Sequence, residues 1–172
     1  MSSHLYLLDA NIFITAAKNF YSFDFGYNFW NFLVQKAKNN EVASIDKVFD
    51  EIKNGDDELK SWAETHFSKY FFDTKSSDEI LENYAKLMNW VENKKEKYKQ
   101  DAIDMFIKPN NADAWLIACA MTDKEKFIIV TFEKKDDNAK RRIKIPNVCE
   151  EFDIKYCDLY KMLKNLNFKF NF

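Results

Sequence analysis

The sequence predicts an α/β fold built around a mainly parallel sheet. Two short apolar runs, Leu5–Leu8 and Phe127–Thr131, have the length and continuity of strands that are buried on both faces. Between them, apolar residues recur at helical spacing. Strands that alternate with helices are typical of layered folds in which helices cover a parallel sheet.

The remaining elements follow from the same two periodicities. Three weaker strands are predicted at Glu41–Ile45, Tyr70–Phe72 and Ile154–Cys157. Helices are predicted from about Ile12, over Trp30–Ala37, Val48–Ile52, Leu59–Phe67, Ile80–Val91 and Leu159–Leu166, and over the fully buried stretch ADAWLIACAM. Ser44 or Asp46 is expected to cap the helix after the second strand. The charged stretch ENKKEKYKQ, residues 92–100, is expected to be a solvated face.

Composition excludes several classes of function. The chain has 172 residues, of which 47% are hydrophobic and 31% charged, so one domain with a substantial core is expected. With two glycines in all, the sequence contains no glycine-rich phosphate loop and no GxSxG nucleophile motif. Because the net charge is −2, any affinity for nucleic acid has to come from a local positive patch.

Cysteine usage and hydropathy bear on the cellular location. The three cysteines lack metal-ligand spacing and are expected to be reduced thiols in a cytoplasmic protein. No apolar run approaches ~20 residues, so no membrane-spanning helix is expected. The N-terminus also lacks the basic, apolar and small-residue regions of a secretion signal.

Four acids stand at the ends of predicted elements rather than on polar faces. Asp9 follows the first strand, and Glu133 follows the strand Phe127–Thr131. Asp113 lies in the first turn of the buried helix, and Glu51 lies in the helix after the second strand. Open parallel sheets bind ligands beyond the carboxyl ends of their strands, where gathered carboxylates suit Mg²⁺ or Mn²⁺. Such a metal activates water for phosphodiester hydrolysis without a Ser, Cys or His nucleophile.

Each of these polar residues also has a purely structural explanation. Asp9 can end its strand and cap the next helix, and the helix dipole favours Asp113 in a first turn. Glu51 can be an ordinary surface residue, and Glu133 can belong to a charged loop. Asn11 is by type a cap or turn residue. Spacing alone leaves both explanations open.

Four motifs in a fixed order carry a resemblance to a known family. They are LLDANIFI, VFDEI, ADAWLIACA and IIVTFE. In this order they resemble the PIN-domain family, whose pattern is Asp-x-Asn, a helical Glu, an Asp that opens a helix, and Thr-x-Asp/Glu. The matching positions are Asp9, Asn11, Glu51, Asp113, Thr131 and Glu133. The resemblance implies a three-layer α/β/α PIN-like fold in a single domain over residues 1–172, with a helical segment at about 56–107 inserted.

PIN domains are metal-dependent ribonucleases, and many are the toxin half of a bacterial toxin–antitoxin pair of the VapC type. The resemblance implies Mg²⁺ or Mn²⁺ held by Asp9, Glu51, Asp113 and Glu133, with Asn11 and Thr131 orienting ligands or water. It also implies an RNA substrate, a cognate antitoxin and a homodimer. Two features depart from the common pattern: the fourth acid is Glu, and the segment 56–107 is longer than in the smallest PIN toxins.

Three further features bear on substrates and partners. The basic loop 134–144 supplies four candidate substrate-binding residues, Lys134, Lys135, Arg141 and Arg142; the alternative is a solvated loop. Five aromatic residues between the first two helices can stack RNA bases, fill the core or form a dimer contact: Phe20, Tyr21, Phe23, Phe25 and Tyr27. The apolar tail at 168–172 can add an edge strand, pack on the core or contact a partner.

Two other classes of function stay open at the level of sequence. A catalytically silent PIN-like module would bind RNA or protein, and would depend on the basic loop but not on Asp9. A receiver-like α/β domain would use Asp9 as a phosphoacceptor. The metal-dependent ribonuclease is the hypothesis that accounts for all four motifs together.

Overall fold

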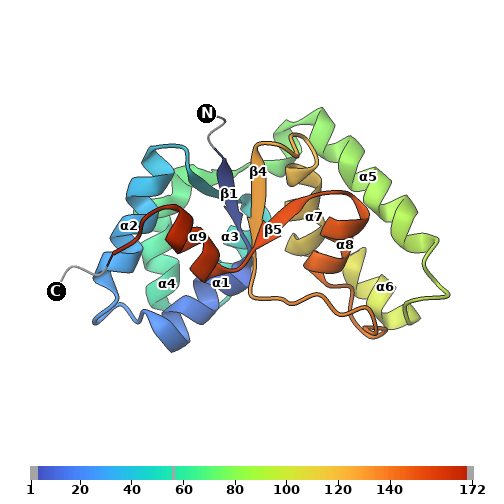
Figure 1. Cartoon of the computed structure of the whole chain (residues 1–172), viewed down its shortest axis with the longest axis horizontal. Coiled ribbons are helices and arrows are strands. Elements are labelled where there is room, and N and C mark those ends of the chain that lie inside the picture. Colours follow the sequence, from blue (N-terminus) through green and yellow to red (C-terminus); the bar gives the residue numbers. More distant parts are fainter. Residues whose placement is uncertain (1–3, 56, 170–172) are drawn as a thin grey trace.

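Five strands form the sheet in the described part of the chain, residues 4–55 and 57–169 of a computed structural model (Figure 1). They are β1 (Leu5–Leu8), β2 (Val42–Ile45), β3 (Phe71–Phe72), β4 (Phe127–Val130) and β5 (Lys155–Cys157). Their order is β3-β2-β1-β4-β5, and every neighbouring pair is parallel. All five predicted strands are therefore confirmed, and the two apolar runs lie side by side as β1 and β4.

Helices cover both faces of this sheet. They are α1 (Ala10–Thr15), α2 (Tyr27–Lys38), α3 (Asp46–Lys53), α4 (Asp57–Trp62), α5 (Asp78–Glu92), α6 (Gln100–Phe106), α7 (Ala112–Ala120), α8 (Ile145–Glu151) and α9 (Leu159–Asn165). Shorter turns are the π-helical η1 (Ala16–Phe20) and η2 (Ala63–Phe67) and the 3₁₀ turns η3 (Ser68–Tyr70) and η4 (Thr74–Ser76). In Figure 1, α1, α2, α4 and α9 lie to one side of the strands and α5 to α8 to the other. The predicted three-layer α/β/α arrangement is confirmed.

Two helices, α6 and α8, were not predicted. Each has seven residues, about two turns, which is too short for a helical repeat of apolar residues to stand out. The segment 56–107 is also not purely helical, because it supplies β3 at the edge of the sheet. Its description as an insertion within a single domain stays a prediction.

The predicted cap of α3 is wrong. Ile45 occupies the N-cap position and makes no side-chain capping bond. The Ser44 hydroxyl instead donates to the Leu8 carbonyl oxygen at 2.6 Å, which ties β2 to β1. The Asp46 carboxylate accepts from the backbone N–H and the hydroxyl of Thr74, at 3.3 and 2.8 Å. Ser44 therefore joins two strands and Asp46 joins the start of α3 to η4, and neither side chain caps α3.

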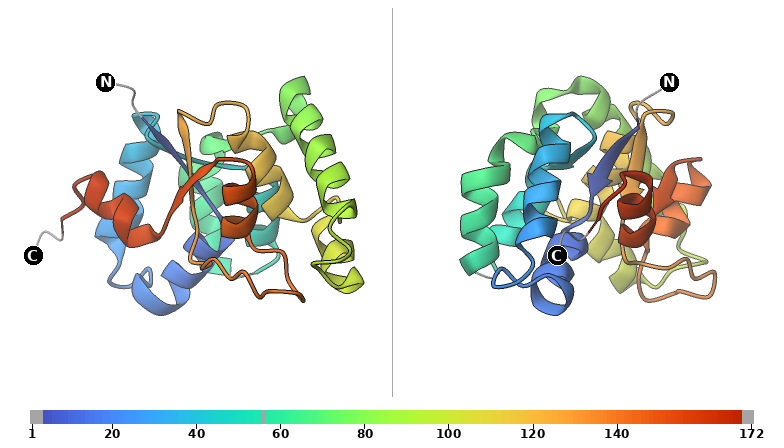
Figure 2. Two further views of the ribbon diagram at one scale, coloured as in Figure 1. Left: turned by 45° about the vertical axis from the view of Figure 1, so that its right-hand side comes forward. Right: turned by 60° about the vertical axis from the view of Figure 1, so that its left-hand side comes forward.

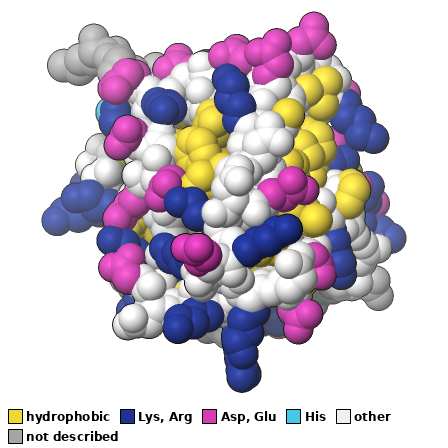
Figure 3. Space-filling view, turned by 90° about the vertical axis from the view of Figure 1, so that its right-hand side faces the viewer, with side chains coloured by type: hydrophobic (Ala, Val, Ile, Leu, Met, Phe, Trp, Pro, Cys, Tyr) yellow, Lys and Arg dark blue, Asp and Glu magenta, His cyan; other side chains and the backbone are white. Residues whose placement is uncertain are grey.

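The charged stretch 92–100 is mostly solvated, as predicted. Figure 3 shows Lys and Arg interspersed with Asp and Glu on the face that α5 and α6 present. Lys94 pairs with Glu151 of α8 at 3.1 Å. Tyr98 is the exception to the prediction, because its ring is only 3% exposed and anchors the stretch to the core.

The C-terminal segment packs on the core as far as it is described. The ring of Phe168 lies 6.3 Å from that of Phe29 and 4.8 Å from that of Phe32, so the chain after α9 runs alongside α2 (Figure 2). Phe170 and Phe172 lie outside the described residues. All three cysteines are free, as expected. No described helix is both long and apolar enough to cross a membrane.

Candidate active site

The site begins where β1 and β4 end side by side. The Asp9 amide donates to the Val130 carbonyl oxygen at 3.0 Å, which extends the pairing of the two strands by one residue. The Asp9 carboxylate makes no capping bond to α1 and instead accepts the Thr131 hydroxyl at 2.8 Å. Asp9 is 4% exposed and Thr131 1%. Two rigid strand ends therefore fix a buried carboxylate in place.

The Thr131 hydroxyl is the centre of a fully used hydrogen-bond network. It donates to Asp9, and accepts from the Asn11 side-chain amide at 3.1 Å and from the backbone N–H of Glu133 at 3.1 Å. The Asn11 amide oxygen accepts the backbone N–H of Phe132, also at 3.1 Å. One donor and two acceptors exhaust the capacity of a hydroxyl. Asn11 and Thr131 therefore fix both the Asp9 carboxylate and the backbone after β4, in line with the orienting role that the resemblance implies.

The start of α7 places the second buried acid, Asp113. The Asn111 side-chain oxygen accepts the Asp113 backbone N–H at 3.0 Å and so caps the helix. Its amide group donates to the Met105 and Phe106 carbonyl oxygens at 3.2 and 3.3 Å, which ties α6 to α7. Asn111 was not among the predicted site residues, although an Asn just before an apolar helix is a capping signal.

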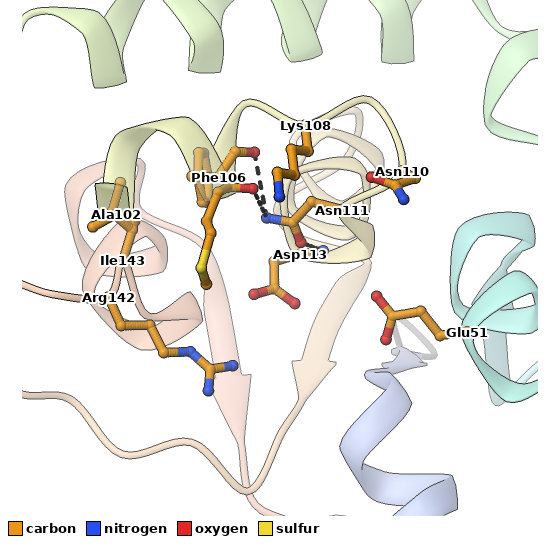
Figure 4. A pocket seen from close by; sticks show the side chains of 10 residues that line it. Glu51, Ala102, Phe106, Lys108, Asn110, Asn111, Asp113, Arg142 and Ile143 are labelled. Carbon is orange, nitrogen blue, oxygen red and sulfur yellow. Dashed lines mark hydrogen bonds between the residues drawn. The ribbon is translucent and has the colours of Figure 1, made fainter. Parts of the chain in front are cut away.

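Asp113 points into a cavity of about 460 Å³. Figure 4 shows its carboxylate between the carboxylate of Glu51, from α3, and the guanidinium of Arg142, from the basic loop. Lys108 lines the same cavity. Three of the residues singled out in the sequence therefore meet in one cavity, although they come from three distant segments.

Four carboxylates interact electrostatically at this edge of the sheet. Burial, with repulsion from Glu133 and Glu51, raises the pKa of Asp9 to about 7. Burial raises the pKa of Asp113 well above its ordinary value, and repulsion from Asp9, Glu133 and Glu51 adds to this, while Arg142 opposes it. Partial burial likewise raises the pKa of Glu51. A bound cation would relieve this repulsion.

Glu133 differs from the other three acids, because both of its carboxylate oxygens are already engaged. One pairs with the Arg142 guanidinium at 2.6 Å, and the other accepts the backbone N–H of Ile145 at 2.8 Å. The Glu133 side chain is 10% exposed, whereas that of Arg142 is 59% exposed. Glu133 thus closes the basic loop onto the start of α8 and places a positive charge beside the acids.

The donor set suits Mg²⁺ or Mn²⁺ in its chemistry, although the acids are not gathered tightly. Within residues 4–55 and 57–169, no three His, Cys, Asp or Glu side chains form a group that could hold a metal ion. Mg²⁺ commonly binds only one or two carboxylates and keeps several waters. Asp9 and Asp113 meet this smaller requirement. The residues therefore fit the metal, with Glu133 less suited to direct ligation than predicted, because its oxygens have other partners.

The basic loop divides into paired and unpaired cations. Lys135 pairs with Glu150 at 2.7 Å, and Arg142 pairs with Glu133. For Lys134 and Arg141, the described residues offer no carboxylate within ion-pair distance. All four substrate-binding assignments stay predictions, and Lys134 and Arg141 are the two that no carboxylate in the described part of the chain neutralises.

The five aromatic residues that were predicted between the first two helices, Phe20 to Tyr27, serve different purposes. Tyr21 stacks on Phe29 at 4.2 Å and Phe23 stacks on Trp30 at 4.5 Å, so these two belong to the packing of α2. The other three are exposed: Phe20 (41%), Phe25 (76%) and Tyr27 (70%). The structural explanation therefore holds for two of the five rings.

Comparison with known proteins places the chain in a family. A family model described as "Domain of unknown function (DUF4411)" matches residues 6–170. The chain belongs to the DUF4411 family. Curated proteins offer no match. Among solved structures, this DUF4411 chain is similar to one in the "crystal structure of VapBC2 from Rickettsia felis bound to a DNA fragment from their promoter".

The similarity to the VapBC2 chain has a TM-score of 0.53 and 18% sequence identity, over 90% of the DUF4411 chain and 98% of the other. It confirms the PIN-like fold that the four motifs predicted. At this identity the likeness concerns the fold alone, so the chemistry of the DUF4411 chain has to be argued from its own residues.

The raised pKa of Asp9 predicts a pH dependence of stability for this DUF4411 chain. Because the folded protein holds the Asp9 proton more tightly than the unfolded chain, the free energy of unfolding should fall as pH rises from about 4 to about 7. In Asp9→Asn this contribution is absent. Urea unfolding of the two metal-free proteins across this range measures the difference. Parallel profiles would show that Asp9 titrates normally.

Proposed function

We propose that this protein is a Mg²⁺- or Mn²⁺-dependent endoribonuclease that hydrolyses a phosphodiester bond. The observation that carries the proposal is the pair Asp9 and Asp113. Both carboxylates lose solvation at the carboxyl edge of the sheet, which raises the pKa of each, and repulsion from Asp9 raises the pKa of Asp113 further. Such an arrangement is costly for a protein without a cation and is characteristic of functional sites.

The residues of the site take separate roles in this proposal. Asp9 and Asp113 hold the cation, and Glu51 faces it across the cavity. Bound there, the metal would supply an activated water and neutralise charge on the leaving oxygen. Thr131 keeps the Asp9 carboxylate in one orientation. Arg142 lies where it can attract the phosphate that the acids would otherwise repel.

We further propose that the protein is the cytoplasmic toxin component of a toxin–antitoxin pair. The similar solved structure is a VapBC2 complex, and the motifs of this chain resemble those of VapC-type PIN toxins. The acidic site also suits a basic side chain of an antitoxin, because the Glu133–Arg142 pair already joins a guanidinium to it. A homodimer rests on the PIN resemblance alone.

The direct test is cleavage of single-stranded and structured RNA by purified protein, after any co-purified partner has been removed. We expect cleavage with Mg²⁺ or Mn²⁺ and none with EDTA. Mn²⁺ binding is measured in parallel by calorimetry, so that metal binding and catalysis are read separately. Cleavage that persists in EDTA would overturn the metal-dependent mechanism.

A catalytically silent module is the alternative, and two observations favour it. Glu133 is engaged by Arg142 and Ile145, and the acids of the described chain do not form a preformed group of three metal ligands. If calorimetry detects no Mn²⁺ binding to folded protein and no RNA is cut, the silent module is the better description.

Arg142→Ala is expected to tighten Mn²⁺ binding about fivefold, because it removes a positive charge that competes with the metal. Arg142 lowers the pKa of Asp113 and of Glu51, which shows that its charge is felt at both carboxylates. The measurement is calorimetry at fixed ionic strength. Arg141→Ala is the matched control, since Arg141 is exposed and is not ion-paired within the described chain. Equal tightening in both variants would indicate only a general effect of net charge.

A further inference from the structure

Three aromatic rings cluster next to the acidic site, two of them exposed and one, Phe132, partly buried. Phe20 ends η1, Phe132 follows Thr131, and Tyr160 lies in α9. The ring of Phe20 lies 5.9 Å from that of Phe132 and 6.3 Å from that of Tyr160, and the rings of Phe132 and Tyr160 are 6.4 Å apart. We call these three residues the aromatic ledge. It joins segments from the beginning, the middle and the end of the chain.

The ledge is held rigidly to the acidic site. The Phe132 backbone N–H donates to Asn11, so Phe132 lies between Thr131, which binds Asp9, and Glu133, which binds Arg142. Phe132 therefore adjoins, in the chain, both the residue that binds Asp9 and the acid Glu133. A molecule on the ledge would therefore extend directly from whatever lies at the acids.

The ledge has open aromatic surface. Phe20 is 41% exposed and Tyr160 is 53% exposed, although both side chains are large and hydrophobic. The three rings are tilted or edge-on to one another, at interplanar angles of 42°, 75° and 64°, so none of them is stacked flat on another. Exposed ring faces of this kind are the surfaces on which unpaired bases stack.

A cavity of about 400 Å³ adjoins the ledge, and Lys134 lies in its lining beside two of the rings. Phe132 and Tyr160 line this cavity together with Glu133, Lys134, Lys135 and Asp158. The Glu133 carboxylate is engaged by Arg142 and by the backbone N–H of Ile145. Lys135 is held by Glu150, and the Asp158 carboxylate accepts the backbone N–H of Lys161. Lys134 is exposed and, among the described residues, forms no ion pair. The cavity thus offers aromatic surface and, among the described residues that line it, one cation without an ion-pair partner.

We propose that the aromatic ledge and Lys134 form a subsite for one unpaired nucleobase of single-stranded RNA, with Lys134 on the adjoining phosphate. The neighbouring acids would repel the negatively charged phosphate of a nucleotide but not its neutral base. The base can therefore lie on the rings, while the phosphate needs the positive charge of Lys134. The proposal rests on RNA being the substrate and names the form of RNA that the site takes.

The test measures binding of a short labelled single-stranded RNA by fluorescence anisotropy. All proteins carry Asp9→Asn and are assayed with Mg²⁺, so that cleavage does not interfere. Tyr160→Ala and Phe20→Ala should each weaken binding about tenfold, and Tyr160→Phe should restore it. Tyr27→Ala is the matched control, because Tyr27 is 70% exposed but lines a different cavity, and it should leave the affinity unchanged. One abasic position in the RNA should reproduce the loss.

The outcomes separate this proposal from the proposed function. Ledge-dependent binding of RNA by a protein whose wild type cuts nothing would support the subsite and count against the nuclease. Metal-dependent cleavage by wild type with unchanged RNA affinity in Tyr160→Ala would leave the nuclease standing and overturn the subsite. The subsite is also overturned if duplex RNA binds as tightly as single strands, or if Tyr160→Ala alters only self-association in sedimentation.

Discussion

Asp9→Asn is expected to lower RNA cleavage about a thousandfold while leaving the protein folded. The substitution keeps the shape of the side chain and leaves an oxygen to accept the Thr131 hydroxyl, but it removes the charge that would hold the cation. It also removes a buried charge whose ionisation the site opposes, so the metal-free variant should be more stable than wild type at pH 8. Loss of activity together with a gain in stability distinguishes a functional acid from a structural one.

Asp50→Asn is the matched control for this substitution. Asp50 lies in α3 next to Glu51, its side chain is 54% exposed, and it pairs with Lys53 at 2.8 Å. Its removal should change cleavage less than about twofold. If Asp9→Asn and wild type cleave equally, the activity does not arise from this site, and a contaminating nuclease or a different pocket has to be sought.

The three central strands, β1, β2 and β4, could be predicted from the sequence because they are largely buried on both faces. Burial makes Leu5–Leu8 and Phe127–Val130 continuous apolar runs. The short helices α6 and α8 carry no such signal. Tertiary contacts position them instead, because α8 packs against α7 and the Asn111 side chain ties α6 to the start of α7.

The sequence could predict which residues belong to the candidate site, but not which of them bond to one another. Asp9, Glu51 and Asp113 stand near the ends of predicted strands and helices, and such ends can be recognised in a sequence. The hydrogen bond between Asn11 and Thr131 joins residues 120 positions apart, and no local sequence pattern indicates it. The engagement of Glu133 by Arg142 depends on a loop without regular structure, whose path follows from tertiary contacts. Two of the three ledge residues, Phe132 and Tyr160, were missed for the same reason.

Thr131→Val should lower the free energy of unfolding by about 3 kcal/mol, because several polar groups lose their partner in a buried place. Valine replaces the hydroxyl by a methyl of similar size, so no cavity forms. The Asn11 amide, the Glu133 backbone N–H and the Asp9 carboxylate all lose a hydrogen bond. At 1% exposure, water cannot readily replace the hydroxyl. Urea unfolding at pH 8 measures the loss.

Thr131→Ser is the control, since it keeps the hydroxyl and should cost only about 1 kcal/mol for the lost methyl group. A double-mutant cycle with Asp9→Asn then isolates the bond to the carboxylate. Because a bond to a charged acceptor is stronger than one to a neutral amide, Thr131→Val should cost less in the Asp9→Asn protein than in wild type. Additive losses would show that Thr131 stabilises the backbone after β4 independently of Asp9, and that some other contact holds the carboxylate in place.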